Sequence, residues 1–65
     1  MITKEQAMIE DHFIDYWGNR WRRNGVTKTW KTRPEEFRLP IKCGFRQCYA
    51  MTHENAHRFF VDGRE

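Results

Sequence analysis

Two cysteines and two histidines are the residues of this sequence with the clearest potential for chemistry. Thiolates and imidazoles are the ligands that zinc prefers in proteins, and two histidines four positions apart on a helix share one face. A structural zinc ion would also stabilise a chain that is too short for a large core. A zinc-stabilised module is therefore one alternative, and its ligands would be Cys43, Cys48, His53 and His57.

The spacing of these residues argues against zinc. Zinc fingers with two cysteines and two histidines place about twelve residues between the second cysteine and the first histidine. Here only four residues separate Cys48 from His53. An extended chain would move roughly 16 Å over that interval and would have to fold back at once. The competing interpretation is that Cys43 packs in the core, that Cys48 lies on the other face, and that the histidines are surface or capping residues.

Catalysis by a cysteine has less support than zinc binding. A nucleophilic thiol needs a base and a third group that orients the base, and no such arrangement accompanies Cys48. A catalytic pocket of about 300–1,000 Å³ would also take most of the core that 65 residues can build. We therefore expect a protein that is not an enzyme.

The cations of the chain are concentrated in its middle. Residues 20–48 carry nine cationic side chains against two carboxylates, a net charge of +7, whereas the whole chain has a formal charge of +3. The flanking residues 1–19 and 49–65 carry −3 and −1. Cations bind phosphates, and exposed aromatic rings stack on bases. We therefore expect a nucleic-acid or partner-binding surface made of Arg20, Arg22, Arg23, Lys28, Trp30, Lys31, Arg33, Arg38, Lys42 and Arg46.

The same composition is also compatible with a protein partner. Arginine, methionine and aromatic residues are enriched at the energetic centres of protein interfaces. The chain has twelve lysines and arginines, three methionines and three tryptophans. A protein partner, including a second copy of the chain, stays open as an alternative to nucleic acid.

The N-terminal third predicts a long helix that would position part of this surface. A Thr-x-x-Gln capping box at Thr3 is followed by large apolar residues at every fourth position, which is a helical period. Asn24-Gly25 is a plausible helix end. We therefore expect one amphipathic helix over residues 3–23, whose apolar stripe consists of Ile9, Phe13, Trp17 and Trp21.

The rest of the chain predicts short strands. Alternation predicts that Arg38 and Lys42 share a face opposite the apolar row, where Lys28 or Lys31 would extend the surface. Pro40 predicts an edge or a bulge. We expect a strand over residues 26–32, a helical turn over 32–35, a hairpin of 37–43 with 45–51, and a helix over 53–60.

Together these elements predict one α+β domain over residues 1–65. A long N-terminal helix would pack on a small antiparallel sheet, a hairpin plus one further strand, and a short C-terminal helix would follow. The aromatic content argues against disorder. No apolar run approaches the roughly 20 residues of a membrane span. The absence of a signal-peptide pattern and the two cysteines favour a reducing, intracellular setting.

Two stretches of the chain resemble a known group of sequences. TWKTRPEEFRLPIKCG at 29–44 and MTHENAH at 51–57 are similar to a pattern in small uncharacterised bacteriophage proteins, particularly those of actinobacterial phages. The similarity covers less than half of the chain. In that pattern the positions of Cys43 and Cys48 often carry other residues, which argues further against zinc.

The resemblance implies a phage protein in the cytoplasm of a bacterial host. Small phage proteins commonly bind host enzymes, host regulators or DNA. We therefore expect a non-catalytic accessory protein without a cofactor that binds nucleic acid through its basic middle. The alternative is a protein that binds and modulates a host protein.

Overall fold

The computed structural model describes residues 1–63 and consists mostly of antiparallel β-sheet. The only α-helix of this part, α1 (Lys4–Ile9), comes first, and a short 3-10 helix, η1 (Ala56–Arg58), precedes the last strand. No helix among residues 1–63 has the length and apolar character needed to cross a membrane. The strands are β1 (His12–Asp15), β2 (Arg20–Arg23), β3 (Lys28–Trp30), β4 (Arg33–Cys43), β5 (Arg46–Met51) and β6 (Phe59–Val61).

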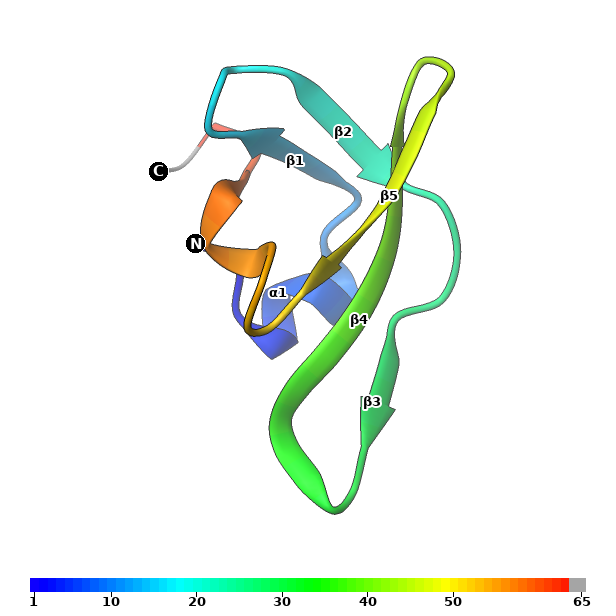
Figure 1. Cartoon of the computed structure of the whole chain (residues 1–65), viewed down its shortest axis with the longest axis vertical. Coiled ribbons are helices and arrows are strands. Elements are labelled where there is room, and N and C mark those ends of the chain that lie inside the picture. Colours follow the sequence, from blue (N-terminus) through cyan, green and yellow to red (C-terminus); the bar gives the residue numbers. More distant parts are fainter. Residues whose placement is uncertain (64–65) are drawn as a thin grey trace.

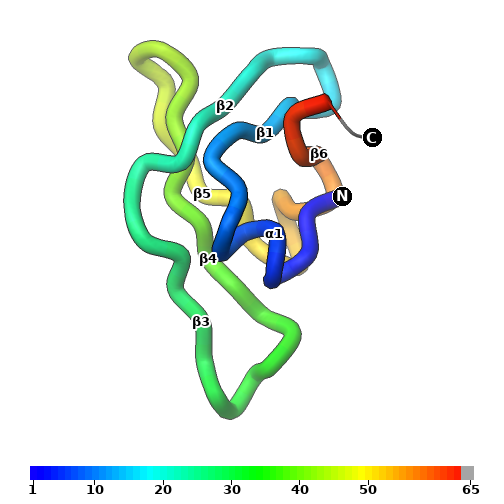
Figure 2. Tube along the Cα trace, turned by 180° about the vertical axis from the view of Figure 1, so that it is seen from behind, coloured from blue at the N-terminus to red at the C-terminus, as the bar shows by residue number. Residues whose placement is uncertain are grey.

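The long strand β4 is the centre of the sheet. Arg38 pairs with Lys28 of β3 and with Met51 of β5, so these two strands lie on opposite edges of β4. β2 pairs further along the edge that β3 uses, and the sheet continues through β1 to β6. The hairpins β3–β4 and β4–β5 extend toward opposite ends of the molecule (Figure 1), and Figure 2 shows β6 beside β1.

One hydrophobic core lies on the inner side of the curved sheet. Phe13, Leu39 and Ile41 are completely buried there, and the indole of Trp21 meets the ring of Phe59 edge-on at 5.8 Å between centroids. The α1 helix closes one end of this core with the buried Ala7. The opposite side of the sheet is therefore left free for polar and charged side chains.

The predicted helix over residues 3–23 is wrong beyond its first turns. The capping box of Thr3 and Gln6 is present, but α1 ends at Ile9. The chain then forms the hairpin β1–β2, in which Phe13 pairs directly with Trp21. Trp17 lies in the turn between them, four positions from each, so a hairpin produces the same spacing as a helix. Gly18 has a φ of +87°, which permits the turn but not a continuing helix.

The predicted helices over 53–60 and 32–35 are also wrong. The backbone turns after Met51 and forms only the 3-10 turn η1 before β6, because Phe59 and Val61 gain burial by pairing with β1. The hydroxyl of Thr52 does not cap a helix; it accepts a hydrogen bond from the Phe37 N–H at 2.7 Å. Residues 33–35 are extended as the start of β4. The predicted α+β class, with its long N-terminal helix and C-terminal helix, is therefore replaced by a six-stranded sheet with one short helix in the described residues.

The strands of the middle segment are predicted better. The hairpin of 37–43 with 45–51 is confirmed as β4 and β5, and β3 occupies the centre of the predicted strand 26–32. Pro40 does not place β4 at an edge of the sheet. It lies between the stretches that pair with β2 and β3, where its carbonyl accepts from the Asn24 N–H. On this edge no strand pairs with β4 at Pro40, although Tyr49 of β5 is opposite it on the other edge, so the missing N–H of proline costs no ladder hydrogen bond.

Candidate nucleic-acid interface

The side of the sheet that faces away from the core is cationic. Directly opposed residues of antiparallel strands share a face, and Lys28 pairs with Arg38 while Arg22 pairs with Lys42. Arg38 and Lys42 alternate along β4 with buried Leu39 and Ile41. We call this surface the outer face; its cations are Arg20, Arg22, Lys28, Arg38 and Lys42. The prediction that Arg38 and Lys42 share a face that Lys28 extends is confirmed.

An arginine–tyrosine stack lies at the centre of the outer face. Tyr49 of β5 pairs with Pro40, and its ring is covered by the Arg38 guanidinium at 4.0 Å from the ring centroid. The tyrosine keeps 45% of its surface exposed. Guanidinium planes and aromatic rings are both surfaces on which unstacked bases bind. The stack is therefore a flat, cationic platform between the flanking lysines.

Tyr49 was not among the residues predicted for the site. The sequence contains a signal for it, because the centre of the hairpin at Gly44-Phe45 fixes which residues are opposed. Counting outward from that centre places Gln47 opposite Lys42 and Tyr49 opposite Pro40, on the face of Arg38. Alternation along β4 alone does not identify Tyr49, because its position on this face depends on the register between β4 and β5.

Most cations of the outer face lack a carboxylate partner. Within residues 1–63, Arg22, Lys28, Arg38 and Lys42 form no ion pair, whereas Arg20 lies 3.5 Å from Asp62. Glu5, the one carboxylate within α1, belongs to the helix that covers the core, so it does not interrupt the outer face. The outer face thus presents positive charge that is not neutralised within the described chain.

Arg23 has a structural position instead. Its guanidinium donates to the carbonyls of Ala7 and Glu10 and to the Thr27 hydroxyl, and Nε lies 3.6 Å from an Asp11 carboxylate oxygen. These carbonyls belong to the last turn of α1, where a cation is favourable. Arg23 therefore links the end of α1 to β2 through hydrogen bonds and is not part of the outer face.

The other predicted residues lie in three further places. Arg46 points to the inner side, where its guanidinium lies 5.2 Å from the centroid of the Trp21 ring. Lys31 is exposed in the β3–β4 turn. Arg33 and Trp30 line a pocket at the end of the outer face, described next.

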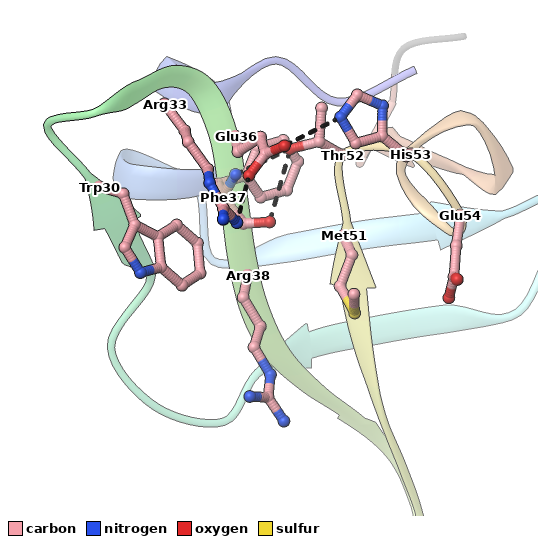
Figure 3. A pocket seen from close by; sticks show the side chains of 9 residues that line it. All are labelled: Trp30, Arg33, Glu36, Phe37, Arg38, Met51, Thr52, His53 and Glu54. Atoms are coloured by element: carbon pink, nitrogen blue, oxygen red, sulfur yellow. Dashed lines mark hydrogen bonds and ion pairs between the residues drawn. The ribbon is translucent and has the colours of Figure 1, made fainter.

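A cavity of about 520 Å³ adjoins the outer face at the β3–β4 end. Figure 3 shows Trp30 on one side of β4 and Met51 on the other, with Arg38 between them. The Glu36 carboxylate accepts from Arg33 Nη1 at 3.3 Å and lies 3.2 Å from His53 Nε2. The pocket, which we call the Trp30 pocket, is lined by Trp30, Arg33, Glu36, Phe37, Arg38, Met51, Thr52, His53 and Glu54.

The predicted zinc ligands are not brought together. Among residues 1–63 no three His, Cys, Asp or Glu side chains converge on a point that could hold a metal ion. Cys43 and Cys48 both pack against the core, because Cys48 pairs with the inward-facing Ile41. His53 contacts Glu36 instead. The expectation that Cys48 lies on the other face is wrong for the same register reason.

The environment of Cys48 keeps its thiol protonated at neutral pH. Burial raises the pKa of Cys48, the nearby Arg46 opposes this shift, and Asp15 adds to it, so that the pKa lies above its ordinary value. A protonated, half-buried thiol is a weak nucleophile and a weak metal ligand. The candidate binding site is therefore the outer face with the Trp30 pocket, and not the cysteines.

Comparison of the chain with protein-family models, with curated proteins and with solved structures finds no match.

Proposed function

We propose that this protein binds single-stranded nucleic acid on its outer face. The observation that carries the proposal is the placement of four cations that have no ion-pair partner among residues 1–63, Arg22, Lys28, Arg38 and Lys42, around the exposed Tyr49 ring. Cations without a carboxylate partner are free to bind phosphates, and sequence-tolerant binding of single strands adds aromatic stacking to a positively charged groove.

We assign different roles to these side chains from their positions on the strands. Arg38 and Lys42 are four residues apart on β4, a separation of roughly 13 Å, and each has a cation opposite it on the neighbouring strand. Lys28, Arg22 and Lys42 bind phosphates along this line, and a base stacks on the Arg38–Tyr49 pair. A duplex would keep its bases away from this platform, so the proposal specifies a single strand.

The setting that fits this proposal is the cytoplasm of a phage-infected bacterium. It is supported by the resemblance of residues 29–57 to small bacteriophage proteins. In this setting the protein is a non-catalytic accessory factor that acts by occupying exposed single strands.

The salt dependence of binding tests the proposal. A fluorescent twelve-nucleotide oligouridylate is titrated with protein at several salt concentrations and anisotropy is recorded. Each phosphate contact contributes about −0.7 to the slope of log affinity against log salt for single strands, so Arg22→Gln should reduce the slope by about that amount. Tyr49→Leu should weaken binding by about 1–3 kcal/mol and leave the slope unchanged. Absence of binding at low salt, or identical slopes in wild type and Arg22→Gln, would contradict the proposal.

A protein partner is the second candidate, and a separate surface favours it. Met8 and Ile9 of α1 and Val26 of the β2–β3 loop line a shallow groove, in which Ile9 is 74% and Val26 85% exposed. Exposed apolar clusters mark protein interaction sites. Capture of one dominant host protein from nuclease-treated lysate, lost in Ile9→Ser and kept in Arg22→Gln, would establish this function. Capture that disappears with nuclease supports the nucleic-acid proposal.

A further inference from the structure

The Trp30 pocket has the walls of a nucleobase site. Trp30 from β3 and Met51 from β5 lie on either side of β4 (Figure 3), and 40% of the tryptophan surface is exposed. A cavity of about 520 Å³ is within the range of small-ligand sites. An indole face and a flexible thioether are the apolar surfaces against which a flat heterocycle packs.

Two polar groups of the pocket can bind a ligand: the Glu36 carboxylate, whose orientation is fixed, and the Arg38 Nε–H, which has no partner among residues 1–63. Glu36 is held from two sides by Arg33 and His53, which orient its carboxylate. A carboxylate has about four lone-pair sites, so both oxygens can accept again. Arg38 also lines the pocket, and its Nε is buried without a hydrogen-bond partner among residues 1–63. A buried donor without a partner is uncommon in proteins, and an acceptor on a ligand that reaches Arg38 Nε would pair with it.

Guanine is the base whose edge matches this pair of groups. Its Watson–Crick edge presents two adjacent donors, N1–H and N2–H, which a carboxylate accepts side by side, and its O6 accepts from an arginine. Adenine and cytosine each place an acceptor beside their single amino donor, and that acceptor would face the Glu36 oxygens. Uracil has one N–H between two carbonyls. Each of these bases leaves one group unpaired or repelled.

We propose that the Trp30 pocket is a guanine-selective subsite for the single strand bound on the outer face, an inference that rests on the proposed function. Arg38 connects the two regions, because it stacks on Tyr49 and also lines the pocket. A strand whose phosphates follow Lys42 and Lys28 toward the β3–β4 hairpin reaches the pocket at its next exposed base. The outer face then supplies general affinity and the pocket supplies base preference.

Four oligonucleotides test this subsite. Oligouridylate nonamers that carry G, A, C or U at the central position are compared by fluorescence anisotropy. The guanine oligonucleotide should bind about tenfold to hundredfold more tightly than the other three, as expected for one good bidentate contact. In Glu36→Gln the preference should fall to within about threefold, because the amide offers only one acceptor. Binding of the all-uridine nonamer should be retained.

Glu35→Gln is the matched control, since it removes the same charge one residue earlier on β4, at an exposed position outside the pocket. It should keep the full guanine preference. Equal affinities for the four oligonucleotides, or an undiminished guanine preference in Glu36→Gln, would overturn the subsite and leave the proposed function standing. Absence of binding to all four would overturn the proposed function itself. A thermal melt of each variant separates these outcomes from unfolding.

Discussion

Asp15 is the side chain on which the first hairpin depends. Its carboxylate is buried and accepts from the backbone N–H groups of Trp17 and Asn19 at 2.9 and 2.7 Å, and from the side chains of Asn19 and Trp21 at 3.0 Å each. Burial by itself raises the pKa of Asp15, but these hydrogen bonds favour the ionised form and together hold the pKa below its ordinary value. The charge is thus stabilised in the folded state more than in the unfolded chain.

The stability of the protein should therefore fall with acid. A carboxylate whose pKa is lowered by folding stabilises the protein above its unfolded pKa of about 3.9, and this contribution is lost as the pH falls through the folded pKa. Asp15→Asn should cost about 1–3 kcal/mol at pH 7, because the amide presents a donor to groups that are all donors. The free energy of unfolding of Asp15→Asn should also change less between pH 7 and pH 2 than that of the wild type. Urea unfolding between pH 2 and 7 measures both effects.

Glu54→Gln is the control for that comparison, since Glu54 is an exposed carboxylate with no hydrogen bond among residues 1–63. It should follow the wild-type pH curve. An Asp15→Asn curve parallel to the wild type at low pH would refute the role given to Asp15.

At the scale of elements, the helix predicted over residues 3–23 is wrong because a helix and a hairpin can have the same spacing of apolar residues. Phe13, Trp17 and Trp21 satisfy a helical period and also a hairpin whose turn contains Trp17. Local spacing cannot distinguish the helix from the hairpin. The hairpin is favoured by a pairing with a distant strand, because Phe13 pairs with Val61 of β6 as well as with Trp21. The β4–β5 hairpin is predicted correctly since its pairing is local and its turn residue is glycine.

The β2–β3 loop depends on one glycine. Gly25 has a φ of +144°, and a Cβ placed on it would lie 2.8 Å from Cγ of Pro40, in the gap where β4 changes partners. Gly25→Ala should therefore cost about 2–3 kcal/mol, through backbone strain and the clash together. Gly18→Ala is the matched control, with a φ of +87° but open space around the added methyl. It should cost about 1 kcal/mol.

Urea unfolding with fitted m-values measures both glycine variants. Equal losses of stability would show that the contact with Pro40 has no effect, and that only the backbone conformation matters.

At the scale of the whole molecule, the sheet separates charges that the sequence mixes. Arg22 and Arg23 are neighbours in the chain, but alternation sends Arg22 to the outer face and Arg23 to the end of α1. Glu36 is one of two carboxylates in the basic segment, and only the pairing of β3 and β5 with β4 brings it into one pocket with Trp30 and Met51. The sequence therefore predicts that a basic surface exists. Which residues form that surface, and which line the Trp30 pocket, depends on how the strands pair.

Binding through the outer face and attraction by the overall charge of the protein lead to different expectations. The double variants Arg22→Gln/Lys42→Gln and Lys4→Gln/Arg58→Gln each remove two positive charges, and only the first removes them from the outer face. If phosphates contact the outer face, the first double variant should lower the slope of log affinity against log salt by about 1.4, from about 0.7 for each contact. The second should change that slope much less, because Lys4 belongs to α1 on the core side of the sheet and Arg58 lines a pocket with Trp21 and Arg46, so neither charge is on the outer face. Anisotropy titrations of oligouridylate at four salt concentrations measure both slopes. Equal reductions in the two variants would mean that the protein attracts nucleic acid by its overall charge, and that the outer face is not a binding surface.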